Sequence, residues 1–160
     1  MIRAAVPADS YAVWELMQEA HNLTPYRDVP LSEEKGKMII ARCIGAPTQF
    51  AWVVEKDGRV EGVLLGAVDE MLWSRKKEAH DILFYVRPAA RGAGHQLARA
   101  FIAWARTTPA RLIGMSVSFG AAGERTETLL EHLGLQRIGG IFIAVNEPSN
   151  TPQINPTSST

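Results

Sequence analysis

Residues 79–105 restrict the fold more than any other stretch, because a glycine-containing turn there joins an apolar run to a helix-like segment. The run Ala79–Val86 is typical of a central strand. Residues 94–106 carry apolar side chains at helical spacing over a wide face: Leu97, Ala98, Phe101, Ile102, Trp104 and Ala105. A strand followed by such a helix indicates a helix that packs on a β-sheet.

The remaining segments complete an alternating pattern of strands and helices. Residues 2–6 predict a strand, 10–21 a helix begun by Asp9 or Ser10, and 31–43 a second helix capped near Ser32. Strands at 50–55 and 60–66 flank the hairpin dipeptide Asp57-Gly58. A charged connection, 69–78, precedes the central strand. After the helix at 94–106 we expect a strand at 110–118, a helix at 123–133 ending at Gly134, and a hairpin at 135–145 turning through Gly139-Gly140.

The predicted order, β-α-α-β-β-β-α-β-α-β-β, is an α/β (α+β) arrangement in which helices cover both faces of a mixed sheet. The 160 residues fit one domain over 1–146. Residues 147–160 are rich in Pro, Ser, Thr and Asn, so we expect a disordered tail.

Composition excludes several classes of protein. Seventeen Lys and Arg balance seventeen Asp and Glu, so the chain has no general positive charge for a nucleic acid. The single cysteine, Cys43, forms no disulfide framework, and His21, His80, His95 and His132 are too scattered to indicate a metal site. No run approaches the roughly 20 apolar residues that span a bilayer, and no signal peptide is visible. We therefore expect a cytoplasmic protein without a membrane partner.

The turn Arg91-Gly-Ala-Gly-His-Gln96 suits a phosphate, because glycines let the backbone approach a ligand and helix-start amides point toward it. An ordinary tight turn is the alternative. A phosphate loop of the Gly-x-x-x-x-Gly-Lys-Ser/Thr type is absent. A dinucleotide fingerprint is also disfavoured, because the turn follows four predicted strands and lacks the later acidic residue.

The segment Val86-x-Pro88-x-x-Arg91-Gly92-x-Gly94 resembles the acetyl-CoA loop, Arg/Gln-x-x-Gly-x-Gly/Ala, of GNAT-family N-acetyltransferases and the strand before it. Residues 129–135 resemble the family's helix ending in Leu-Gly-Phe, and the order of elements agrees from about residue 2 to 145. Residues 79–86, with the following Pro-x-x-Arg-Gly, resemble a group of small GNAT proteins encoded by phages and prophages.

This resemblance implies that acetyl-CoA binds along the strand and the turn. Phe84, Tyr85 and Val86 would pair with pantetheine, and the pyrophosphate would bind Arg91, Gly92, Ala93, Gly94, His95 and Gln96. The implied reaction is direct attack of a primary amine on the acetyl thioester. Two departures stand out: Gln96 replaces the last small residue of the loop, and Leu130 occupies the position where many members place a tyrosine acid.

Asp81 is the leading candidate for the base that takes the amine proton, and its neighbour His80 is the alternative. Adjacent strand residues face opposite sides, so only one of them enters a cleft unless a bulge intervenes. Ser116 is a candidate to position water or protonate sulfur, as is Ser118, and Tyr85 could replace the missing acid. A solvated or packed structural role is the alternative for each.

The acceptor is predicted only as an amine, on a small molecule or a protein. Tyr26 lies in the connection between the first two helices, which often borders the acceptor in GNAT proteins, and Glu70 follows the strand at 60–66. Exposed aromatic residues also offer a homodimer surface. The first rival function is a non-catalytic GNAT-fold module for binding or phage assembly, which Leu130 favours; a nucleic-acid-modifying transferase is disfavoured by the balanced charge.

Overall fold

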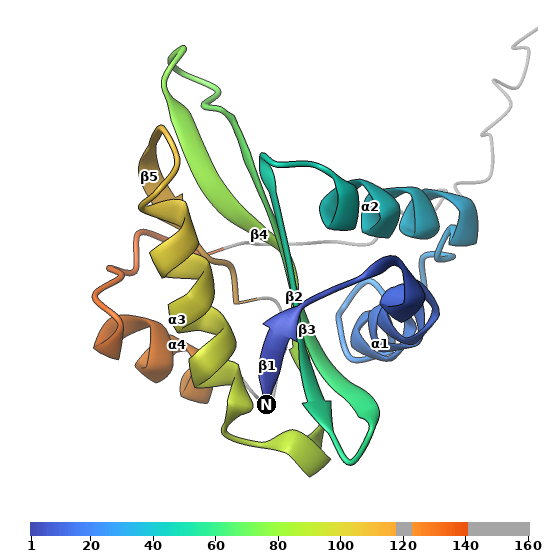
Figure 1. The fold of residues 1–160 in the computed structure, drawn as a ribbon. Helices are drawn as coiled ribbons and strands as arrows, with labels where there is room; N and C mark the ends of the chain where they lie inside the picture. Colours follow the sequence, from blue (N-terminus) through green and yellow to red (C-terminus); the bar gives the residue numbers. More distant parts are fainter. Residues whose placement is uncertain (118–122, 141–160) are drawn as a thin grey trace, which may run out of the picture.

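The computed structural model describes residues 1–117 and 123–140, which form a five-stranded sheet with helices on both faces (Figure 1). The strands are β1 (Ile2–Ala4), β2 (Gln49–Lys56), β3 (Arg59–Glu70), β4 (Lys77–Val86) and β5 (Ala110–Gly114); the α-helices are α1 (Ser10–Asn22), α2 (Glu33–Gly45), α3 (Ala93–Ala105) and α4 (Gly123–His132). Short 3-10 turns, η1 (Pro7–Asp9) and η2 (Pro88–Ala90), precede α1 and α3.

The described strands have the order β1-β2-β3-β4-β5, and among them only β4 and β5 run parallel. This mixed sheet confirms the predicted fold class. Hairpins join β2 to β3 and β3 to β4, whereas α1 and α2 lie between β1 and β2 in the chain. The parallel pair needs a crossover, which α3 supplies.

Each face of the sheet has its own apolar core. On one face α1 and α2 bury Val13, Leu16 and Ile40 against Val53, Val63, Leu65 and Leu83. On the other, α3 buries Leu97, Phe101 and Ile102 against Phe50, Leu64 and Val68. The alternation of faces along β2 and β3 follows from the two-residue period of a strand.

Several local predictions are confirmed. Asp57 and Gly58 both have positive φ, 52° and 73°, as a two-residue hairpin turn requires. The Ser32 hydroxyl accepts a hydrogen bond from the Lys35 amide at the start of α2. Gly134, just past α4, has φ of 87°.

Asp9 does not cap α1 with its side chain, contrary to one of our two alternatives. Its carboxylate instead accepts hydrogen bonds from the Val6 amide at 2.8 Å and from the Arg3 guanidinium at 2.7 and 2.9 Å. A guanidinium offers two charge-assisted bonds, which hold the carboxylate toward β1.

Predicted boundaries were wrong in three places. The charged connection expected at 69–78 spans only 71–76, because β3 continues to Glu70 and β4 begins at Lys77. The expected strand at 110–118 ends at Gly114, and residues 115–117 are irregular. Residues 135–140 form no strand, Gly139 and Gly140 included, so the first half of the predicted hairpin is not formed. Its second half, Ser118, and the tail at 147–160 lie outside the described residues.

Candidate active site

β5 is shorter than β4, so the two strands pair only over the first part of β4. They pair from Lys77↔Ala110 to His80↔Gly114, whereas β4 continues to Val86 and pairs with β3 throughout. Over the described residues, the edge of β4 that faces β5 is thus paired only at its start. The point where this pairing ends lies beside residue 81, and we call it the apex.

A β-bulge lies next to this apex. Leu65 and Gly66 are consecutive on β3, but their partners on β4 are Leu83 and Asp81, so Ile82 is the extra residue. As a result Ile82 and Leu83 both pack against the α1 and α2 core. A bulge changes the direction of a strand and re-aims its side chains, and bulges are frequent beside active sites. The sequence allows for a bulge near Asp81 but does not determine its position.

Asp81 stands on the α3 side of the sheet, because its partner Gly66 lies directly beneath Phe101, where a Cβ would come within 2.5 Å of Cε2. The Ser116 amide donates to Asp81 Oδ1 at 2.7 Å, and the Ser116 hydroxyl donates to Oδ2 at 3.3 Å. Burial raises the pKa of the Asp81 carboxyl, and the bonds from Ser116 limit the rise. The structure thus brings two predicted site residues together at the apex.

His80 pairs with Ala67 and therefore faces the opposite side of the sheet from Asp81. Its Nε2 lies 3.6 Å from Asp69 Oδ2, and its Nδ1 is buried without a hydrogen-bond partner among the described residues. Asp81 and His80 both border the apex, but their side chains lie on opposite faces of the sheet. The bulge at Ile82 comes after them and does not bring them to one side.

The glycine turn lies at the far end of β4. From Asp81 to Val86 the strand covers roughly 17 Å at about 3.3 Å per residue. Beyond η2, Gly92 has φ of 97° and precedes α3, where no side chain caps the first amides and no acidic residue occupies the first turn. Uncapped helix-start amides carry partial positive charge and suit an anion.

Within the turn, Gly92 and Gly94 have different reasons to be glycine. A Cβ on Gly92 would meet nothing within 4 Å, so its positive φ is the constraint, whereas a Cβ on Gly94 would lie 3.3 Å from Phe84 Cζ. Gly94 thus lets α3 approach β4. His95 and Gln96 are exposed. The longer side chain of Gln96 therefore fits without displacing the helix.

An ion-pair network that sequence reasoning missed joins α1 to the end of β4. The Arg87 guanidinium donates to Glu19 at 2.6 and 2.9 Å and to the Val60 carbonyl at 3.2 Å. The Tyr85 hydroxyl donates to Glu19 at 3.4 Å, and burial raises the pKa of Tyr85. Tyr85 faces the α1 core, so it is poorly placed as the missing proton donor. Arg87 is separated from Glu19 by 68 residues, and no local signal links them.

The other predicted residues lie apart from the apex. Glu70 is the last residue of β3, not part of a loop; it pairs with Lys77, about 13 Å along β4 from Asp81. Tyr26 lies in the α1–α2 connection and is 45% exposed. Leu130 is buried on α4 and offers no proton.

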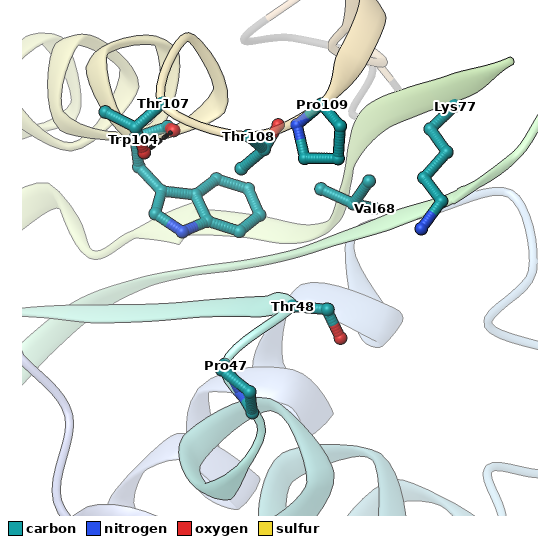
Figure 2. Close-up of a pocket in the computed structure, with 8 residues that line it drawn as sticks. All are labelled: Pro47, Thr48, Val68, Lys77, Trp104, Thr107, Thr108 and Pro109. Carbon is teal, nitrogen blue, oxygen red and sulfur yellow. Dashed lines mark hydrogen bonds between the residues drawn. The ribbon is translucent and has the colours of Figure 1, made fainter.

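Two surface cavities lie away from the apex. One, of about 230 Å³, is lined by Trp104, Val68 and Lys77 and by the loops at 47–48 and 107–109 (Figure 2). Lys77 is the first residue of β4, so this cavity lies at the opposite end of the strand from the glycine turn. The other, of about 240 Å³, adjoins the Asp57 hairpin. The described residues contain no cluster of three or more His, Cys, Asp or Glu side chains that could hold a metal ion. None of the described helices has the length and apolar character needed to cross a bilayer.

A family model described as the acetyltransferase (GNAT) family matches residues 11–134, which include α3, the glycine turn and Asp81. The chain belongs to the GNAT family. A search of curated proteins found no match to it. The matched range includes β4, β5 and the glycine turn.

Solved structures of other acetyltransferases share the fold of this GNAT protein at low identity. An aminoglycoside 6'-N-acetyltransferase from Acinetobacter haemolyticus is 14% identical, with a TM-score of 0.66 over 93% of this chain and 99% of that one. AAC(6')-Iy, in complex with the bisubstrate analogue CoA-S-monomethyl-acetylneamine, is 14% identical, with a TM-score of 0.67 over 92% and 98%. Glucosamine-6-phosphate N-acetyltransferase from Arabidopsis thaliana is 13% identical, with a TM-score of 0.67 over 92% and 98%.

Proposed function

We propose that the protein is an acetyl-CoA-dependent N-acetyltransferase that acetylates a primary amine. One observation carries this proposal: β5 ends at Gly114 and, over the described residues, leaves the edge of β4 beyond His80 unpaired, with Asp81 at the apex and the uncapped start of α3 at the other end. A single extended ligand with an anionic head and a reactive tail fits that arrangement.

The residues present fit acetyl-CoA. The start of α3 and the exposed Arg91 supply donors for a pyrophosphate, and the edge of β4 over Phe84–Val86 lies where an extended amide chain would add like a strand. The roughly 17 Å from Val86 to Asp81 is of the order that an extended pantetheine arm spans. When bound, acetyl-CoA supplies an activated acyl group.

Asp81 is the proposed general base. Its raised pKa makes the carboxylate a stronger proton acceptor than an exposed aspartate, and Ser116 fixes its orientation. In the reaction the amine nitrogen forms a bond to the acetyl carbon, the carbon–sulfur bond breaks, and the amine proton passes to Asp81. His80, on the other face, is the base to test in parallel.

The thiolate that leaves needs a proton, and the buried Leu130 has none to give. We assign this role to the Ser116 hydroxyl, 3.3 Å from Asp81 Oδ2, which can pass the proton from the carboxylic acid to sulfur. The cycle then ends with Asp81 ionised again, and no further acid is required.

Calorimetric titration with acetyl-CoA tests the proposal. We expect binding of about micromolar affinity. His95→Glu places a negative charge on an exposed residue at the α3 start and should weaken binding by repelling phosphate, whereas Ala103→Glu, exposed at the far end of α3, is the matched control. Gly94→Glu is a poorer probe, because its side chain would also displace Phe84. Failure of the parent protein to bind acetyl-CoA would overturn the proposal.

A non-catalytic binding module is the second candidate, and the buried Leu130 in place of a tyrosine favours it. The two functions differ in turnover, not in binding. A screen of small-molecule amines and lysine peptides for release of CoA thiol separates them. Binding of acetyl-CoA without thiol release from any amine would favour the module.

A further inference from the structure

The connection between β3 and β4, residues 71–76, forms a projecting hairpin tip with two solvent-exposed apolar side chains. Leu72 is 84% exposed and Trp73 is 87% exposed. β2 accompanies β3 only as far as Gln49↔Ala67, so the last three residues of β3 extend past β2, and the hairpin stands out beyond α2 (Figure 1). Neither side chain belongs to either core.

The tip is an ordered turn. The Met71 amide donates to the Lys76 carbonyl at 2.9 Å, the Ser74 amide to the Met71 carbonyl at 3.3 Å, and the Lys76 amide to the Ser74 hydroxyl at 3.1 Å. Ordering a turn in advance lowers the entropy lost when its side chains bind something. The backbone thus holds Leu72 and Trp73 in solvent.

Positive charge accompanies this apolar pair. Arg75, Lys76 and Lys77 are exposed and consecutive, and none forms an ion pair within the described residues. Lys77 faces Glu70 across the hairpin. The tip itself carries Arg75 and Lys76 with no acidic residue over 71–76, whereas Asp69, Glu70 and Glu78 lie on the strands at its base. A partner that contacts only the tip should therefore be negatively charged.

The small contact area of the tip favours some classes of partner over others. Two large side chains offer on the order of 400 Å², about half of the 800 Å² that each partner of a stable protein complex buries. In a symmetric dimer of tips, Arg75 and Lys76 would also meet their own copies. A single-stranded nucleic acid would use Trp73 for stacking but leave Leu72 unused. A bilayer interface accepts both side chains and needs no large matching surface.

We propose that the hairpin tip docks on an anionic lipid bilayer surface, with Leu72 and Trp73 entering the interface and Arg75 and Lys76 facing acidic headgroups. This departs from our expectation of no membrane partner, which followed from the missing spanning segment. Surface contact needs no such segment. The proposal is independent of the acetyltransferase function.

Vesicle co-sedimentation of the full chain tests the proposal. The parent should bind vesicles of phosphatidylcholine mixed with phosphatidylglycerol and bind pure phosphatidylcholine much less. At about 1 kcal/mol per charge, Arg75→Gln with Lys76→Gln should weaken binding about 30-fold. Leu72→Ser with Trp73→Ser should abolish it. The matched control is Tyr11→Ser with Met38→Ser, which removes exposed apolar side chains from α1 and α2 and should bind like the parent.

Three results would overturn the proposal. They are equal binding to both kinds of vesicle, loss of binding in the Tyr11 and Met38 control, and no binding of the parent at low salt. Self-association of the parent that the Leu72 and Trp73 variant loses would assign the tip to a second copy instead. None of these outcomes depends on whether acetyl-CoA binds.

Discussion

Replacement of Arg87 by alanine should weaken acetyl-CoA binding from a distance. Arg87 joins β4 to η2 and the glycine turn. Its guanidinium contacts the Glu19 carboxylate, the Val60 carbonyl and, at 3.6 Å, the Glu61 carboxylate, and its backbone amide donates to the Glu61 carbonyl at 2.8 Å. The substitution keeps the amide bond and removes the guanidinium. The residue that leads into the glycine turn then no longer forms an ion pair with α1.

The size of the effect follows from exposure. The Arg87 side chain is 25% exposed and Glu19 is 41% exposed, so solvent screens the pair in part. Exposed ion pairs contribute about 0–1 kcal/mol, and breaking a buried pair costs about 3–5 kcal/mol. We expect about 2 kcal/mol for Arg87→Ala, which is about a 30-fold change in the unfolding equilibrium constant, and about 1 kcal/mol for Glu19→Gln.

Two measurements check this prediction. Urea unfolding should show the loss of stability, and titration with acetyl-CoA should show a dissociation constant about tenfold higher. Because the guanidinium is held by Glu19, Glu61 and Val60 and makes no contact with Asp81, the KM for acetyl-CoA should rise while kcat changes little. Arg99→Ala, exposed on α3 and without an ion pair in the described part of the chain, is the control. Reduced stability with unchanged cofactor affinity would refute the link between Arg87 and the turn.

The same pair predicts a pH dependence. Hydrogen bonds from Arg87 lower the pKa of the Glu19 carboxyl below its ordinary value. The stabilisation is therefore complete above the ordinary glutamate pKa of about 4.3 and is lost as pH falls through the lower, folded-state pKa. The stability gap between the parent and Arg87→Ala should narrow in acid. A gap that stays constant to low pH would contradict the assignment.

Two further predictions concern α2 and the candidate base. Gly36→Ala should destabilise by about 1–3 kcal/mol, because its Cβ would press into the Trp14 ring, with Cε3 2.9 Å away, whereas Gly45→Ala has open space and should stabilise by up to about 1 kcal/mol; thermal melts with opposite shifts check this. Asp81→Asn should lower turnover at least about 100-fold with little change in acetyl-CoA affinity. Since burial raises the pKa of Asp81, the favourable contribution of its protonated form is present below the unfolded-state pKa and is lost as pH rises through the folded-state pKa. In Asp81→Asn, this fall in stability with rising pH should be absent. The acidic limb of the pH–rate profile should also disappear, and an unchanged profile would reject Asp81 as base.

The order of the elements and the glycine turn could be predicted from sequence because their signals are local. Asp57-Gly58 favours positive φ, Ser32 supplies a cap within three residues, and the apolar spacing of residues 97–105 matches one helical face. Residues 135–140 show where local signals failed. Two glycines suggested a hairpin, but a strand forms only when a neighbouring strand pairs with it, and sequence spacing does not report a partner.

Tertiary structure alone decided the geometry of the site. The bulge at Ile82 depends on how β4 aligns with β3, and the contact of Ser116 with Asp81 spans 35 residues. Asp81, Ser116 and the glycine turn could be identified as candidates from the sequence, because residue type and the two-residue period of a strand are local properties. The sequence did not determine on which face of the sheet each residue lies, and it did not identify Glu19. Strand register, strand ends and ion pairing arise from packing between segments that are distant in sequence.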